Sequence, residues 1–373
     1  MVIINQMSGY LFVDIANIAA SVYDEVILMT GSLHPLNTPL NHKVKVVSVK
    51  SYNRKNLKSR FMSWVISFIQ IIYLLKFKYT DYQILASSNP PLNTWLPLFV
   101  NKKTSLMVLD LYPEALSDTG MISNRHVVHK IWSRLNHKAY QKFHSIITLT
   151  EGMKQAVMLY RKHDLHVVSA WHDDFSLVEK KRLKGNIFVE KYNLQNKFIV
   201  LYSGNLGREY EVEGLTEVAN YLKAFQEIVL VIVGKGWKFE ILKNLIVQQE
   251  LTNMLLLPHQ PTAYFNASMS AMDIGIIAQA TTAPKVCIPS KTFNILAFGK
   301  PLLCLGSSDT DLSSLITKNR LGGVFASNDV AQMSDFILSL YKDKSLYQQY
   351  SEAAKSISSQ FTKDNAKMII DLT

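Results

Sequence analysis

The sequence predicts an α/β protein built from two doubly wound domains, each a parallel sheet covered by helices. Three observations support this prediction. The chain has 373 residues, which is more than one ordinary core holds. Short apolar runs alternate with amphipathic stretches along the chain, as expected of strand–helix–strand crossover units. A single polar and charged stretch, 172–197, interrupts this alternation.

The interruption divides the chain into parts. We expect an N-terminal Rossmann-like domain over 1–171, a connection over 172–197, a C-terminal Rossmann-like domain over 198–358 and a final helix over 359–373. This helix could pack back onto the N-terminal domain. Doubly wound domains place their sites at the carboxyl ends of their strands. Two such domains would face each other across a cleft, and the residues that follow each strand are the site candidates.

In the first half, apolar runs predict seven strands. They are expected at 2–5, 25–29, 44–49, 83–87, 105–110, 145–149 and 166–169. Amphipathic spacing predicts helices between most of them, most clearly at 10–20 and 127–143.

In the second half, the same reasoning predicts six strands and six helices. The strands are expected at 198–202, 228–233, 254–257, 274–277, 302–305 and 323–325. The helices are expected at 210–222, 239–249, 291–298, 329–341, 347–359 and 364–371. The two halves share this format without a close sequence repeat.

Charge and cysteine content limit the class of protein. The net charge is +11, and residues 1–178 hold 19 Lys and Arg against 11 Asp and Glu. A basic N-terminal half suits an anionic bilayer or a phosphorylated acceptor. It also suits nucleic acid, but no reader motif or aromatic–basic platform supports that partner. The two cysteines, Cys287 and Cys304, lack metal-ligand spacing and fit a reducing cytoplasm.

Other signals point away from secretion and metal binding. The first residues read as a strand without a basic start or a small-residue cleavage site, so no signal peptide is expected. Histidines at 126, 129, 137 and 144 do not have a zinc spacing. The Asp-x-Asp shape at 309–311 reads as a helix cap. We therefore expect no metal site.

The segment PSKTFNILAFGKP at 289–301 is the most informative stretch. Ser290 is placed to cap a short helix that ends at Gly299. A helix N-terminus offers free N–H groups and a positive dipole end, and Lys291 adds a full charge there. This combination predicts a phosphate site. The alternative is a capped helix with a surface lysine.

Two glycine-containing turns follow strands in the same half. SGNLGR at 203–208 brings Gly204 and Asn205 to a strand end and could present Arg208 to a diphosphate. VGKG at 233–236 places Gly234, Lys235 and Gly236 after the next strand. The full dinucleotide fingerprint is absent, so a nicotinamide cofactor is not supported. The alternative is a pair of ordinary turns.

In the N-terminal half, polar residues follow three strands. Asp110 ends an apolar run and could bind or deprotonate an acceptor hydroxyl. Ser88 and Asn89 follow one strand, and Glu114 lies just beyond Asp110. Glu151 follows a third strand, where a first-turn helix acid is the simpler interpretation. For Asp110 the alternative is a helix cap or a solvated loop acid.

The stretch 61–75 is nearly all apolar, with Lys and Arg on both sides. It is shorter than the roughly 20 residues of a spanning helix and contains Ser63, Ser67 and Gln70. A helix buried between layers and an interfacial helix with basic flanks both explain it. A transmembrane span is the least favoured of the three.

Together these segments resemble the retaining glycosyltransferases of the GT-B fold, in the group-1 (family four) class that uses nucleotide sugars. The resemblance covers nearly the whole chain. SGNLGR, VGKG and the 289–301 segment are similar to that family's donor-binding elements. SSNPP at 87–91, DLYPE at 110–114 and TEGM at 150–153 are similar to a subgroup that builds bacterial surface polysaccharides, such as O-antigen or capsule, often with N-acetylated deoxyamino sugars.

The chain departs from the family pattern in three places. Many members carry two glutamates eight residues apart, where this chain has Val286 and Asn294. The resemblance assigns the second glutamate to the nucleotide ribose and the first to the sugar hydroxyls. The glycine-rich loop near the N-terminus is also reduced, to Met7, Ser8 and Gly9.

The resemblance implies a hexosyl transfer with retention, without a metal or other cofactor. It implies a nucleotide-sugar donor, UDP-linked, and a polyprenyl-diphosphate-linked acceptor at the cytoplasmic face of the inner membrane, where the protein would be peripheral. Asp110, Arg208 and Lys291 would be catalytic. Gly204, Asn205, Gly234, Lys235, Gly236, Ser290 and Asn294 would bind the donor, and Ser88, Asn89, Glu114 and Glu151 the acceptor. A nucleotide-sugar epimerase and a non-catalytic sugar-binding partner remain alternatives.

Overall fold

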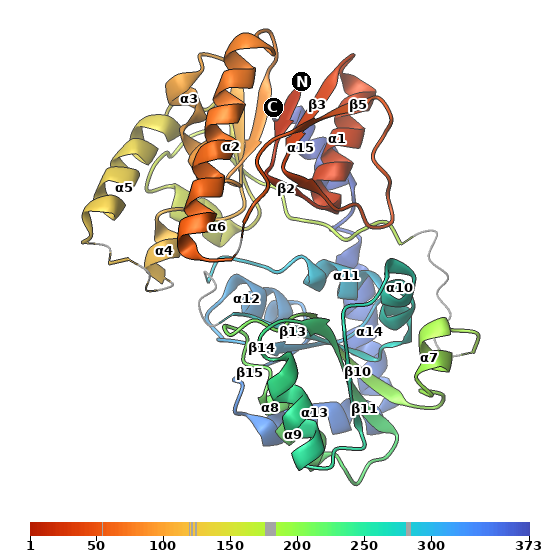
Figure 1. The fold of residues 1–373 in the computed structure, drawn as a ribbon. Helices are drawn as coiled ribbons and strands as arrows, with labels where there is room; N and C mark the ends of the chain where they lie inside the picture. The colour runs from red at the N-terminus through yellow and green to blue at the C-terminus, as the bar shows by residue number, and fades with distance from the viewer. Residues whose placement is uncertain (54, 119, 121, 124, 176–183, 281–284) are drawn as a thin grey trace. The chain divides into compact units, whose positions relative to one another are not determined.

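The computed structural model describes residues 1–373 except 54, 119, 121, 124, 176–183 and 281–284. The chain divides into two compact units (Figure 1). The N-terminal unit comprises Met1–Asp174 together with Phe361–Thr373, and the C-terminal unit comprises Phe175–Gln360. Each contains a parallel sheet with helices, as the alternating pattern predicts.

The N-terminal unit is built on a seven-stranded parallel sheet in the order β5-β3-β1-β6-β7-β8-β9. Its strands are β1 (Val2–Ile4), β3 (Val26–Thr30), β5 (Val44–Ser48), β6 (Ile84–Ser87), β7 (Thr104–Val108), β8 (Ile146–Thr148) and β9 (Leu165–Val167). β1, β3, β6 and β7 are buried throughout, as expected of parallel strands covered on both faces. Two short strands, β2 (Met7–Ser8) and β4 (Ser32–Leu33), form a separate pair.

Helices of very different length cover this sheet. They are α1 (Tyr10–Val22), α2 (Leu57–Phe77), the 3-10 helix η1 (Pro91–Trp95), α3 (Leu96–Phe99), α4 (Glu114–Asp118), α5 (Val127–Tyr140) and α6 (Glu151–Val157). The last helix, α15 (Asp364–Asp371), returns to this unit and packs beside α1 (Figure 1). The Ser145 hydroxyl fastens it by donating to the Leu372 carbonyl at 2.6 Å.

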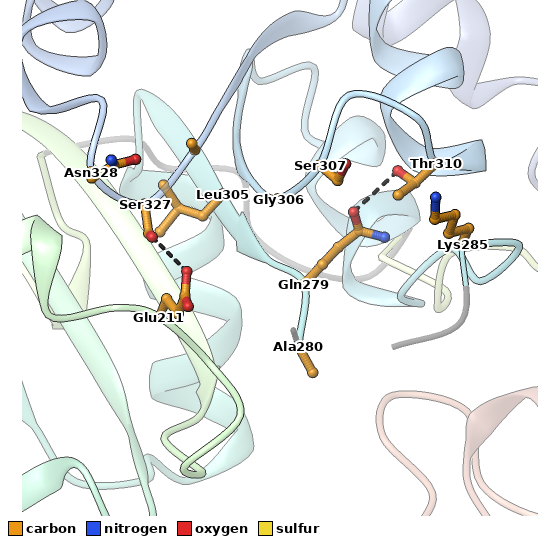
Figure 2. Close-up of a pocket in the computed structure, with 11 residues that line it drawn as sticks. Glu211, Gln279, Ala280, Lys285, Leu305, Gly306, Ser307, Thr310, Ser327 and Asn328 are labelled. Atoms are coloured by element: carbon orange, nitrogen blue, oxygen red, sulfur yellow. Dashed lines mark hydrogen bonds between the residues drawn. The ribbon is translucent and has the colours of Figure 1, made fainter. Parts of the chain in front are cut away.

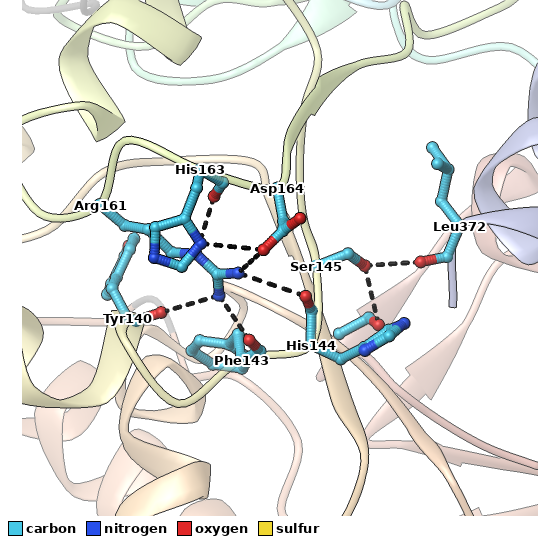
Figure 3. A network of polar contacts seen from close by, with 9 residues as sticks. Tyr140, Phe143, His144, Ser145, Arg161, His163, Asp164 and Leu372 are labelled. Carbon is cyan, nitrogen blue, oxygen red and sulfur yellow. Dashed lines mark hydrogen bonds and ion pairs between the residues drawn. The ribbon is translucent and has the colours of Figure 1, made fainter.

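Arg161 connects two chain segments beside β8 and β9 of the N-terminal sheet through hydrogen bonds (Figure 3). Its guanidinium is buried and donates to the carbonyls of Tyr140, Phe143, His144 and His163 and to the Asp164 carboxylate. One side chain thereby joins the end of α5 to the segment that leads into β9. Because a planar fork of five donors satisfies several carbonyls at once, arginine is suited to this position.

The C-terminal unit has a six-stranded parallel sheet in the order β12-β11-β10-β13-β14-β15. Its strands are β10 (Phe198–Asn205), β11 (Ile228–Lys235), β12 (Met254–Leu257), β13 (Ile274–Ala278), β14 (Leu302–Leu305) and β15 (Gly322–Phe325). Its helices are α7 (Ile187–Lys191), α8 (Gly214–Tyr221), α9 (Phe239–Gln248), α10 (Thr262–Ala271), α11 (Lys291–Ala297), α12 (Asp311–Lys318), α13 (Val330–Lys342) and α14 (Lys344–Ser358).

Several boundaries differ from the prediction. β10 and β11 run two or three residues further, because their pairing continues to the register Asn205 opposite Lys235. α8 starts at Gly214, since Tyr210 instead pairs with Ala280 in an isolated bridge. α2 is longer than expected. α10 was not predicted, and its weak amphipathic pattern gives little signal.

The expected connection 172–197 is not uniformly a linker. α7 lies within it and packs on α10 in the C-terminal unit. Asn186 caps α7 by accepting from the Phe188 and Val189 N–H groups, and its own amide donates to the Ala267 carbonyl. A helix of five residues is too short for periodicity to reveal. Residues 176–183 of this stretch lie outside the described residues.

Candidate functional site

The glycines of the C-terminal unit let two strand ends pack together. Gly204 lies opposite Gly234 in the β10–β11 register. A Cβ on Gly234 would lie 2.2 Å from the Gly204 carbonyl oxygen, and one on Gly236 would lie 2.4 Å from the same atom of Leu206. Gly236 also has φ +149°, which favours glycine. The predicted turns are therefore a close-packed sheet edge with exposed backbone at its end.

Lys291 places its ammonium in the space that Gly204 leaves open. A Cβ on Gly204 would lie 1.9 Å from Lys291 Nζ. The same Nζ lies 5.1 Å from the centroid of the Tyr202 ring, a distance typical of cation–π contact. No carboxylate of the described residues pairs with it. Burial lowers the pKa of Lys291 to about 8, because desolvation penalises the charged form.

Arg208 follows β10 and is exposed. Its guanidinium carbon lies 4.7 Å from the centroid of the Trp237 ring. Trp237 comes directly after Gly236, so the two glycine-containing segments each contribute one partner of this contact. No ion pair of Arg208 occurs in the described part of the chain. Arg208 is thus a second cation at this sheet edge that no acid neutralises.

The start of α11 differs from the prediction. Ser290 occupies the N-cap position, but its φ and ψ of −59° and −26° are helical and its side chain caps nothing. The predicted serine cap is therefore wrong, because capping requires an extended residue. Asn294 is buried. Thr292, one residue after Lys291, carries a buried hydroxyl that has no hydrogen-bond partner among the described residues. It is a polar group that the sequence did not single out.

In the N-terminal unit, Ser88 and Asp110 come together at neighbouring strand ends. The Ser88 hydroxyl is buried and accepts from the Leu109 and Asp110 N–H groups at 2.9 and 3.0 Å. Asp110 is exposed. Ser88 therefore holds the backbone that carries Asp110. The neighbouring Asn89 is half-buried and bonds through its backbone to Gln6.

The other two predicted acceptor residues make internal contacts. The Glu114 carboxylate accepts from the Tyr160 hydroxyl, and burial raises the pKa of that tyrosine. Glu151 is the first residue of α6 and is exposed. It accepts from Gln155 one turn later at 2.9 Å. This geometry matches the simpler interpretation of Glu151 as a first-turn acid.

A cavity of about 480 Å³ lies along the same edge of the C-terminal sheet (Figure 2). Residues following β13, β14 and β15 line it, and Glu211 joins them from the β10–α8 segment. Within it the Thr310 hydroxyl donates to Gln279 at 3.1 Å, and Ser327 donates to Glu211. None of the predicted site residues lines this cavity. Its residues lack a sequence motif, because several separate strand ends supply them.

The Asp-x-Asp segment at 309–311 has a structural explanation. Thr310 caps α12 by accepting from the Ser313 N–H at 3.1 Å, which confirms the cap interpretation of 309–311. Asp309 pairs with Lys285. Among the described residues, no group of three or more His, Cys, Asp or Glu side chains gathers in a way that could hold a metal ion.

This geometry can bind an anion. Backbone at the end of a parallel strand, an ammonium in a glycine gap and a guanidinium on an adjacent tryptophan together suit the oxygens of a diphosphate. The structure brings Gly204, Gly234, Gly236 and Lys291 into one place, with Arg208 on the segment that follows β10. Tyr202 and Trp237 belong to this site but were missed, because an aromatic residue beside a glycine turn is not a motif.

Comparison with known families agrees with this geometry. The family of group 1 glycosyl transferases matches residues 186–357, which includes every donor-site residue named above. The C-terminal unit carries the group 1 glycosyl transferase sequence pattern. The match covers just under half of the chain and lies within the C-terminal unit.

Two bacterial relatives align with parts of the chain. A putative colanic acid biosynthesis glycosyl transferase, WcaI from Escherichia coli (strain K12), is 32% identical over 120 residues, or 32% of this chain and 29% of that protein. The probable glycosyltransferase WbjE from Pseudomonas aeruginosa is 21% identical over 261 residues, or 68% of this chain and 64% of its own length. The chain thus aligns with less than two thirds of either relative.

Solved structures establish the fold. The glycosyltransferase WaaG, which is involved in lipopolysaccharide biosynthesis, matches 100% of this chain and 98% of its own with a TM-score of 0.71 and 14% identity. Anabaena HepE in complex with UDP and glucose matches 99% of this chain and 98% of its own, with a TM-score of 0.72 and 14% identity. The chain has the GT-B fold, which confirms the predicted fold class.

Proposed function

We propose that this protein is a glycosyltransferase that moves a sugar from a UDP-linked donor to a lipid-linked saccharide in bacterial polysaccharide synthesis. The observation that carries the proposal is the Lys291 ammonium, held in the gap at Gly204 without a carboxylate partner among the described residues. A partly desolvated, unneutralised cation at a strand end needs an anionic ligand. The HepE complex with UDP and glucose supports the choice of donor.

The chemical difficulty of such a transfer is the departure of UDP. Negative charge grows on the diphosphate as the glycosidic bond breaks, and preorganised cations stabilise that charge. Lys291 is already in place. Arg208, whose guanidinium lies over the Trp237 ring, would supply the second cation. Because these two cations supply the charge, the proposed transfer needs no metal, and chelation with EDTA should leave its rate unchanged.

Asp110 is the proposed acceptor-orienting residue. It is exposed at the end of β7, with its backbone held by Ser88. In a transfer with retention, the acceptor hydroxyl attacks from the side of the leaving group, and the departing phosphate takes its proton. Asp110 would then accept a hydrogen bond from the acceptor and fix its orientation. An N-acetylated amino sugar is the donor sugar that the resemblance of 87–91, 110–114 and 150–153 favours.

The test combines transfer and nucleotide binding. Lys291→Ala is expected to reduce transfer by about 10²- to 10³-fold, the usual effect of removing one preorganised group from a developing anion. Arg208→Ala should reduce transfer by about tenfold or more. Lys318→Ala, an exposed lysine on α12, is the matched control and should behave as wild type.

Three outcomes contradict the proposal. The first is wild-type UDP affinity and wild-type transfer in both Lys291→Ala and Arg208→Ala, which removes the donor-site assignment. The second is conversion of the sugar nucleotide without any acceptor, which identifies an epimerase. The third is nucleotide binding without turnover across a donor and acceptor panel, which would identify a non-catalytic sugar-binding protein.

A further inference from the structure

One face of α2 remains uncovered by the N-terminal unit to which it belongs (Figure 1). Five apolar residues at spacings of three and four share this face, as neighbours on a helix do. We call them the α2 stripe: Met62, Ile66, Ile69, Tyr73 and Phe77, exposed by 48%, 36%, 60%, 62% and 72%. The Tyr73 and Phe77 rings lie 5.1 Å apart and form its aromatic end.

The opposite face of α2 fixes the helix in the N-terminal unit. Trp64, Phe68, Ile71 and Leu75 are buried. The Ser63 carbonyl accepts from the Gln6 amide at 3.0 Å, and the Leu75 carbonyl accepts from Lys102 Nζ at 2.8 Å. α2 is long and apolar enough to cross a membrane, but a spanning helix would abandon these contacts. A helix fixed in this way offers its outer face to a surface.

The charges on α2 and on the residues that flank it, from 55 to 78, are all of one sign. Lys55, Lys58, Lys76 and Lys78 are exposed on or next to the helix. The sequence holds no Asp or Glu between residues 26 and 80. An apolar helix face with a basic border matches an anionic bilayer, which accepts the apolar side chains below its headgroups and attracts the lysines to them.

A second copy of the chain fits this surface less well. Pairing α2 against α2 would bring Lys58 and Lys76 of both copies to one interface, with no acid on the same face to balance them. Like charges at an interface oppose association. A bilayer removes this conflict because its own anionic groups balance the lysines.

We propose that the α2 stripe docks the N-terminal unit on the surface of an anionic membrane, with α2 lying parallel to the bilayer. Ile69, Tyr73 and Phe77 enter the boundary between headgroups and acyl chains. Lys58 and Lys76 contact the headgroup phosphates. The proposal stands apart from the sugar transfer, because it requires neither donor nor acceptor.

Vesicle flotation of the full chain tests this docking. Wild-type protein should float with phosphatidylcholine vesicles that contain ~30 mol% phosphatidylglycerol and stay behind with phosphatidylcholine alone. Raising the salt from about 0.05 M to about 0.5 M should weaken the binding. The double variant Ile69→Ser with Phe77→Ser should lower the partition coefficient at least about tenfold, and so should Lys58→Glu with Lys76→Glu.

Val247→Ser is the matched control. Val247 is an exposed apolar residue on α9 of the C-terminal unit, and its loss should leave flotation unchanged. Because substitutions on an exposed face should not unfold the protein, UDP affinity and the circular dichroism of each variant must match wild type. Wild-type flotation by the α2 variants, or no flotation of wild type at low salt, overturns the proposal. A stable dimer that Ile69→Ser with Phe77→Ser converts to monomer, without vesicle binding, also overturns it and identifies a second copy as the occupant.

Discussion

The two units share one architecture, yet the polar residues at their strand ends differ in the partners that they have within the protein. In the N-terminal unit, Ser88 and Glu114 are engaged by internal hydrogen bonds. In the C-terminal unit, Lys291 and Arg208 contact aromatic rings and no acid of the described residues. The proposed anion site thus lies at the sheet edge where glycine leaves room for a cation. At the edge of the N-terminal sheet the exposed residue is Asp110, and its neighbours Ser88 and Glu114 serve the fold.

The two units also have separate cores. The N-terminal unit buries the polar side chains of Arg161 and Asp14 beside its apolar residues. The C-terminal unit has a continuous apolar cluster on one face of its sheet, from Val200 and Leu215 to Leu303 and Leu340. Substitutions can therefore weaken one unit and leave the other intact, and the predictions that follow use this difference.

The largest effect is expected from Arg161→Ala. The change leaves the buried carbonyls of Tyr140 and Phe143 and two part-buried carbonyls without their shared donor, which should lower the unfolding free energy of the N-terminal unit by about 3 kcal/mol. Hydrogen exchange should show this loss in β8 but not in β10, with UDP affinity retained. Lys162→Ala, the exposed neighbour, is the control. Equal loss of protection in β10 would show that the units do not respond separately.

A smaller effect is expected from Asp14→Asn. Burial raises the pKa of Asp14 to about 6, and the hydrogen bond from Trp171 at 2.9 Å only partly offsets this. The folded state holds its proton to a higher pH than the unfolded state, whose pKa is 3.8. The stability of the N-terminal unit should therefore fall as the pH rises from about 4 to about 6.

Asn removes this pH dependence and still accepts from Trp171. At pH 7 the variant should exceed wild type by about 2 kcal/mol, and near pH 4 the two should converge. Thermal unfolding across this pH range measures the difference. A variant that is less stable than wild type at pH 7 would contradict the prediction that the ionised Asp14 carboxylate destabilises the folded state.

Gly204→Ala should weaken UDP binding by about tenfold, or about 1.4 kcal/mol. The added methyl group occupies the position of Lys291 Nζ and displaces the flexible side chain without disturbing the sheet. In a Lys291→Ala background the same substitution should change UDP affinity little, because no ammonium is left for the methyl group to displace. Gly9→Ala is the control, because no atom lies within 4 Å of the added carbon. Calorimetry measures the UDP affinity of the two single variants and the double variant. If their losses of binding free energy are additive, Gly204 and Lys291 act independently and the proposed contact between them does not matter for binding.

The smallest effect is expected from Glu151→Gln. This residue bonds to Gln155 on its own helix, so its loss should change the acceptor KM less than about twofold. Asp110→Asn should raise that KM or lower kcat by about tenfold or more. A large effect of Glu151→Gln would restore it as an acceptor residue.

The positions of most strands along the chain could be predicted from the sequence, because buried parallel strands are continuous apolar runs. Lys291 and Gly204 could be proposed from their motifs. Their contact could not, since it joins α11 to β10 across almost ninety residues of chain. The failed cap at Ser290 has a similar cause. Serine favours the N-cap, but backbone angles decide whether it caps, and those depend on the preceding loop.

The N-terminal site was harder to predict. Glu114 follows a strand as a ligand residue would, and only the fold shows Tyr160 donating to it. The length of α2 was underestimated because its first turn is polar and basic, whereas Asn56 supplies the cap by accepting from the Ser59 N–H at 2.8 Å. The exposure of the α2 stripe follows from packing, which no periodicity can supply when a helix is apolar on both faces.

The pH dependence of UDP affinity tests the account most directly. The free protein holds Lys291 with a pKa of about 8, and a bound diphosphate requires its charged form. Wild-type affinity should therefore fall about tenfold between pH 7 and pH 9.5, whereas Lys291→Ala should bind weakly and independently of pH over that range. If Lys291→Ala reproduces the wild-type curve, the ammonium at Gly204 does not bind the diphosphate.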